Sequence, residues 1–132
     1  MRALSSTAAG AALAALALAA PVAAQQQRTA QATLLDESGE RVGEVLLTET
    51  ANRGVLLQVR LDGAPEGRHA FHIHETGACE PTFEAAGGHF SPEGSEHGFL
   101  SPHGAHAGDL TNLSIPSDGE TDEARLAPGV TL

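Results

Sequence analysis

The 132-residue chain contains no lysine, tryptophan or tyrosine, a single cysteine and only four phenylalanines. Its seven basic residues, all of them arginine, stand against 17 acidic ones, which gives a formal net charge of −10. Phosphate contacts need clustered cations, so a chain this acidic with no basic block is a poor binder of nucleic acid. A single cysteine excludes a disulfide within the chain and a zinc site made of four cysteines. The length fits one domain.

Residues 1–24 have the pattern of a secretory signal peptide. Arg2 supplies one positive charge, an Ala/Leu-rich run follows, and Val22–Ala24 matches a small-residue cleavage site. The apolar run is shorter than the ~20 residues that cross a bilayer, so a membrane anchor is the weaker interpretation. We therefore predict a signal peptide at 1–24, export to the periplasm or the extracellular space, and a domain at 25–132 that does not contact a membrane.

Six short segments have the composition of β-strands. The clearest is Val55–Leu61, where apolar residues alternate with polar ones in the period-two pattern of a half-buried strand. The other candidates are Thr29–Asp36, Arg41–Glu49, His69–His74, Asp109–Ile115 and Thr121–Leu126. Between the fourth and fifth candidates lies a long stretch rich in Gly, Pro and His, with no periodicity of strand or helix. Short strands at this spacing favour an antiparallel β-sandwich or barrel.

Five of the seven histidines and one aspartate are spaced as metal ligands would be. These candidates are His72, His74, His89, His97, His106 and Asp109. The first two are two residues apart on a predicted strand, so their imidazoles leave the same face. Imidazole suits copper and zinc, and one carboxylate is compatible with zinc. Neighbouring glycines allow the tight turns that fold a loop around an ion. The set as a whole favours a metal site over a group of solvated histidines.

The segment Gly67–His74, GRHAFHIH, closely resembles the signature G-x-H-G/A-F-H-x-H of the copper/zinc superoxide dismutases. Gly87–Pro92 is similar to the family's bridging-ligand segment, and the segments around His97 and His106 resemble its zinc loop. The resemblance covers roughly residues 31–132. It implies an all-β, immunoglobulin-like Greek-key sandwich or barrel in which about six of the family's eight strands are present, with a long metal-binding loop.

The resemblance also implies a role for each candidate. The copper ligands would be His72, His74 and His89. The zinc ligands would be His89, His97, His106 and Asp109, with His89 bridging the two metals. The implied activity is superoxide dismutation, an antioxidant reaction in which Cu(II) oxidises one superoxide to O₂ and Cu(I) reduces a second to H₂O₂. His89 would pass a proton to the product. Copper and zinc are the implied cofactors, superoxide anion is the implied partner, and a homodimer is a further expectation.

The same resemblance bears on the roles of three other residues. His69 resembles a structural histidine, and Cys79 lies where the family has one half of a disulfide, whose partner is absent from this sequence. His103 matches no ligand, and we expect it to be a solvated loop residue.

The sequence ends at Leu132, before the family's usual end, so we expect a domain that is incomplete at its C-terminus. No histidine follows His106 to serve as the family's fourth copper ligand, and Arg125 does not match the position that guides the anion. We therefore expect about one zinc per chain, weaker copper binding and a dismutase rate far below the family's. Two alternatives stay open: a non-catalytic exported module that binds zinc or copper, and a non-functional fragment.

Overall fold

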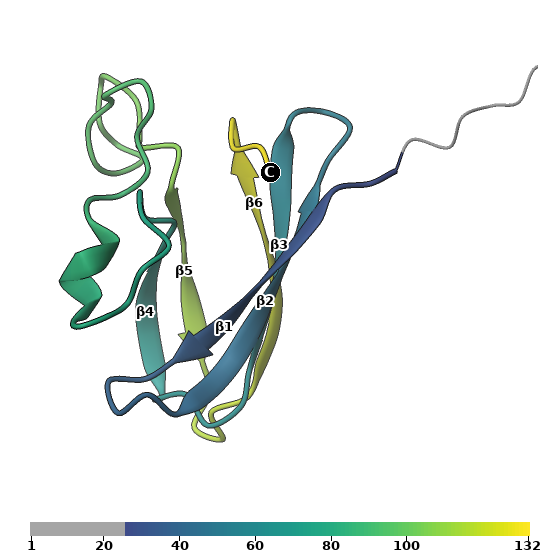
Figure 1. Cartoon of the computed structure of the whole chain (residues 1–132), viewed down its shortest axis with the longest axis vertical. Helices are drawn as coiled ribbons and strands as arrows, with labels where there is room; N and C mark the ends of the chain where they lie inside the picture. Colours follow the sequence, from purple (N-terminus) through teal and green to yellow (C-terminus); the bar gives the residue numbers. More distant parts are fainter. Residues whose placement is uncertain (1–25) are drawn as a thin grey trace, which may run out of the picture.

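The computed structural model describes residues 26–132, which form two antiparallel β-sheets (Figure 1). The strands are β1 (Thr29–Leu35), β2 (Arg41–Glu49), β3 (Gly54–Leu61), β4 (Gly67–His72), β5 (Asp109–Ile115) and β6 (Thr121–Pro128). The larger sheet has the order β1-β2-β3-β6, and the smaller one pairs β4 with β5. The two sheets face one another as layers in Figure 1. The prediction of an all-β sandwich is confirmed.

The predicted signal peptide lies outside the described residues. Within 26–132, no helix has the length and apolar character needed to span a membrane.

The core lies between the layers and is built around β3. This strand pairs with β2 on one side and with β6 on the other. The alternation predicted from the sequence is confirmed, because four apolar residues of β3 are at most 8% exposed: Val55, Leu57, Val59 and Leu61. The smaller sheet contributes the other wall of the core through Leu110, Leu113 and Ile115. Burying apolar side chains from both sheets stabilises the sandwich and fixes the face that each strand turns outward.

β4 ends earlier than the sequence predicts. We expected a strand over His69–His74, but the ladder with β5 stops at His72. The next residue, Ile73, hydrogen-bonds to the loop instead. Its N–H donates to the carbonyl oxygen of Gly108 at 2.9 Å, and its carbonyl oxygen accepts the N–H of Phe90 at 2.8 Å. Gly108 directly precedes β5, so the first bond extends the β4–β5 register by one residue, whereas the loop residue Phe90 takes the Ile73 carbonyl oxygen. The bounds of the other five strands agree with prediction to within two residues.

The connection between β4 and β5 is the long loop that the sequence predicts. Within it the structure contains a single short 3₁₀ helix, η1 (Phe83–Ala86). The loop runs outward through η1 and returns over one end of the smaller sheet before entering β5 (Figure 1). Gly87, Gly98 and Gly104 have positive φ angles of 73°, 91° and 87°, which confirms the expected tight turns at these positions.

Candidate metal centre

Three segments that carry candidate ligands meet at the end of β4, where they are joined by a ring of three backbone hydrogen bonds. Ile73 donates to Gly108, Gly108 donates to Phe90, and Phe90 donates to Ile73, at N···O distances of 2.8–2.9 Å. An ideal Cβ on Gly108 would lie 2.3 Å from the Ile73 carbonyl oxygen and 3.0 Å from the Phe90 nitrogen. Glycine is therefore required for this close approach. The ring brings together the residues beside it, His72, His74, His89 and Asp109.

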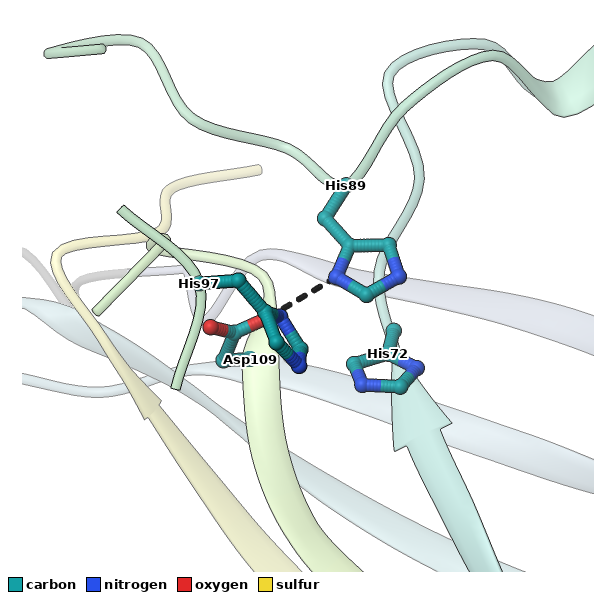
Figure 2. A group of neighbouring side chains, drawn as sticks. All are labelled: His72, His89, His97 and Asp109. Atoms are coloured by element: carbon teal, nitrogen blue, oxygen red, sulfur yellow. Dashed lines mark hydrogen bonds and ion pairs between the residues drawn. The ribbon is translucent and has the colours of Figure 1, made fainter. Parts of the chain in front are cut away.

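Asp109 is the centre of the cluster, and its side chain is 3% exposed. Its Oδ2 atom accepts the backbone N–H of Gly98 at 2.8 Å and that of His106 at 3.2 Å. Its Oδ1 atom faces three ring nitrogens. The Nδ1 atoms of His89, His97 and His106 lie 2.9, 3.2 and 3.4 Å from it. Figure 2 shows His89 and His97 converging on the carboxylate.

The Asp109 carboxyl is ionised at neutral pH despite its burial. Burial acts to raise its pKa, but the N–H of Gly98, the ring of His89 and the nearby His97 together hold the pKa well below its usual range. The cluster therefore contains a fixed negative charge surrounded by imidazoles.

The distances from Asp109 Oδ1 to the three ring nitrogens match the edges of a tetrahedral zinc site. Zinc binds nitrogen and oxygen at about 2.0–2.2 Å, so the donors at two corners of such a site lie about 3.3 Å apart. The three oxygen–nitrogen distances are 2.9–3.4 Å. The His106 Nδ1 atom is buried and has no hydrogen-bond partner. A buried polar atom without a partner costs free energy, and a bound ion would remove that cost. The donor set fits zinc.

His72 and His74 lie against the other side of the cluster. The His72 ring stacks on His89 with centroids 3.8 Å apart, and the His74 ring approaches His89 edge-on at 5.2 Å. The Nδ1 atom of His74 lies 3.0 Å from the carbonyl oxygen of Gly87, so it carries the proton and leaves Nε2 free to bind a metal. Burial and the neighbouring His89 lower the pKa of His72, which favours the neutral ring that metals require.

One close group of potential ligands overlaps the predicted zinc set but is not identical to it. The ligand atoms of His72, His89, His97 and Asp109 all lie within 4.8 Å of one another. This group contains His72 where the predicted zinc set has His106. His72 belongs to this group because its ring stacks on that of His89, which is common to both predicted ligand sets. The other four candidate ligands nonetheless all lie around His89 and Asp109.

Three other predicted residues are not in this group. The Nε2 atom of His69 lies 2.8 Å from the carbonyl oxygen of Pro65, and its structural role stays a prediction. Cys79 is exposed and free in the described chain, and its pairing also stays a prediction. His103 is exposed as expected but not simply solvated, because its Nδ1 atom lies 2.9 Å from the carboxylate of Glu96.

Sequence reasoning misses two contributions of glycines to this site. We expected Gly98 and Gly108 only to allow tight turns. Gly98 also donates its N–H to Asp109, and Gly108 permits the close approach of three backbones. Almost every residue has a backbone N–H, so no sequence signal marks the one that binds a carboxylate.

Comparison with known proteins agrees with the resemblance seen in the sequence. The family model described as copper/zinc superoxide dismutase matches residues 41–132. Two Cu-Zn superoxide dismutases of Aquifex aeolicus are 45% and 40% identical over 81% and 83% of this chain, which corresponds to 63% and 64% of their own lengths. The chain thus spans less than two thirds of these curated relatives.

Solved structures agree with the sequence matches. A SOD-like protein from Bacillus subtilis superposes with a TM-score of 0.72 at 37% identity, covering 76% of this chain and 68% of the other. The Cu/Zn superoxide dismutase from Brucella abortus gives 0.68 at 27% identity, covering 80% and 75%.

Proposed function

Because the chain belongs to the copper/zinc superoxide dismutase family, we propose that it converts superoxide to O₂ and H₂O₂ with copper and zinc bound around His89. One observation carries this proposal. The Nδ1 atom of His89 faces Asp109 at 2.9 Å, while the same ring stacks on His72 at 3.8 Å. A single imidazole has two ring nitrogens on opposite sides, so it can join two neighbouring metal sites.

We propose that His89, His97, His106 and Asp109 hold zinc, and that His72, His74 and His89 hold copper. The buried and unpartnered Nδ1 atom of His106 favours its place in the zinc set over that of His72. When bound, copper supplies one-electron redox chemistry by alternating between Cu(II) and Cu(I), and zinc supplies a fixed positive charge. Asp109 holds the orientation of the His89 ring, and His89 holds and releases a proton at Nε2, the nitrogen directed away from Asp109.

A cavity beside the cluster gives a small anion access to it. The cavity has a volume of about 360 Å³ and is lined by His72, His97, Asp109 and the cation Arg68, among others. The overall charge of −10 repels an anion. Local positive charge in a cleft can outweigh net charge because field lines are focused there, and Arg68 provides such a charge.

We also propose that the protein is exported to the periplasm or beyond and loses residues 1–24. N-terminal sequencing of the protein from the periplasmic fraction should begin at Gln25, and an intact Met1 end would contradict the proposal. A homodimer, a structural role for His69 and a disulfide involving Cys79 belong to the same proposal. Sedimentation equilibrium and thiol titration of the purified protein test the dimer and the disulfide.

A cyanide-sensitive dismutase assay tests the activity directly. Purified protein is loaded with zinc alone or with zinc and copper, dialysed, and analysed for metal content. We expect activity only with both metals, its loss in His72→Ala, and its retention in His103→Ala, a matched histidine variant of the same region. Protein that holds both metals without activity would instead be a non-catalytic binding module. Protein that retains neither metal would overturn the proposed metal centre as well.

A further inference from the structure

A β-bulge in β5 follows Asp109 closely. The β4 residues before Ala70 pair with β5 in one register, and those after it pair in a register shifted by one residue. Ala70 is therefore opposed by two residues, Thr111 and Asn112, as in a β-bulge. Because side chains alternate between the two faces of a strand, one extra residue reverses the face on which the following side chains lie.

The bulge decides which face Asp109 occupies. Leu113 and Ile115 are 4% and 7% exposed and point into the core. In a regular strand Asp109 would share their face, since it is an even number of residues away. Instead Leu110, 5% exposed, points into the core. Asp109 lies opposite His72 on the other face, where the histidines are.

Arg125 of the larger sheet holds both carbonyl groups of the bulge. Its Nε atom donates to the carbonyl oxygen of Thr111 at 3.4 Å, and its Nη2 atom donates to that of Asn112 at 3.0 Å. The guanidinium also forms an ion pair with Glu123 and is only 19% exposed. Arg125 lies opposite Leu57 in the register of β6 with β3, which places it on the inner face of its sheet. It therefore bridges the two layers at β5, a strand in contact with β6.

We propose that Arg125 is a positioning residue of the metal centre. By binding the two bulge carbonyls it fixes the register in which the Asp109 carboxylate faces the histidines. Without these bonds, the regular register, in which Asp109 faces the core, becomes competitive. No hydrogen bond or ion pair joins Arg125 to a candidate ligand, so its effect on Asp109 passes through the bulge. The inference rests on the proposed role of Asp109 as a zinc ligand.

A double-mutant cycle tests this inference, with Co²⁺ as a spectroscopic substitute for zinc. Arg125→Met removes every donor while keeping an unbranched aliphatic stem. We expect it to raise the dissociation constant of Co²⁺ by about 10–100-fold, as is typical for residues that support a ligand. It should also weaken the visible absorption of tetrahedral cobalt. In an Asp109→Ala background, the same change should alter the dissociation constant by less than about twofold. Arg125→Lys, which retains one donor group, should recover part of the affinity.

The core variant Val45→Ala is the control. It lies on β2, away from the bulge, and should lower resistance to urea without changing the affinity for cobalt. The inference is wrong if Arg125→Met leaves the dissociation constant unchanged, or if it weakens binding equally in both backgrounds. If Arg125→Met fails to fold, the cycle is run with Arg125→Gln, which also lacks the guanidinium, with the same two outcomes deciding. A wild-type protein that binds no cobalt would count against the proposed metal centre instead.

Discussion

Replacing Gly108 with alanine should disrupt both the fold around the loop and the metal centre. The new Cβ would lie 2.3 Å from the carbonyl oxygen of Ile73 and 3.0 Å from the nitrogen of Phe90. An ordinary carbon–oxygen contact is about 3.3–3.6 Å, so these backbones must separate by about 1 Å. The hydrogen bonds between them start at 2.8–2.9 Å and would be stretched beyond useful range.

The expected cost follows from these contacts. Each lost backbone hydrogen bond costs about 1 kcal/mol. The two bonds that involve Ile73 are the ones we expect to break, because the new Cβ lies nearest to its carbonyl oxygen. Residual overpacking adds about 1–3 kcal/mol. The free energy of unfolding should therefore fall by about 3–5 kcal/mol, a large part of the 5–15 kcal/mol typical of a domain.

Urea denaturation of the metal-free protein measures this change. Gly77→Ala is the matched control, because Gly77 lies in the same loop, has no atom within 4 Å of its ideal Cβ and does not have a positive φ. It should change the free energy of unfolding by less than about 0.5 kcal/mol. Co²⁺ binding should be lost in Gly108→Ala and retained in Gly77→Ala. If the two variants were equally stable, the close approach at Gly108 would not be a source of stability.

Three further predictions follow from single residues. His106→Ala should weaken zinc binding at least about tenfold in a chelator competition assay, whereas His103→Ala should leave it within twofold, and equal losses would contradict the assignment. The hydrogen bond from the Ser38 side chain is the largest contributor to the lowered pKa of Asp36. Ser38→Ala should therefore raise the midpoint of the Asp36 carboxyl titration followed by ¹³C NMR. Because the folded-state pKa is the lower one, the contribution of Asp36 to stability is present above about pH 4 and declines as pH falls below it. An unchanged midpoint would refute that cause. Arg60→Gln breaks only an exposed ion pair with Asp122 and should cost under about 1 kcal/mol in urea denaturation, against about 2 kcal/mol for the buried Val59→Ala. Similar costs for the two variants would show that the ion pair contributes more than its exposure suggests.

Much of the fold can be predicted from the local alternation of apolar and polar residues. Alternation at Val55–Leu61 predicts β3 because half-buried strands repeat every two residues. The end of β4 is not predictable in this way. Ile73 and His74 continue the strand pattern, but Phe90 binds the carbonyl oxygen of Ile73 and His74 bridges to His89, so the loop between β4 and β5 ends the strand.

The candidate ligands were identifiable from their spacing, but the face of Asp109 was not. By parity with Leu113 the aspartate belongs in the core. The bulge at Thr111 and Asn112 reverses that parity, and it depends on a guanidinium from the other sheet. Neither residue type at the bulge signals it, since the stabilising contact is tertiary. This is the kind of information that pattern reasoning lacks.

Diffraction at the zinc and copper absorption edges, from crystals of the protein loaded with both metals, tests the account most directly. We predict one zinc bound by the Nδ1 atoms of His89, His97 and His106 and by a carboxylate oxygen of Asp109. Copper should lie on the other side of His89, against His72 and His74. A zinc ion held by His72, His89, His97 and Asp109, with His106 outside its ligand set, would contradict the account, as would metal bound away from His89.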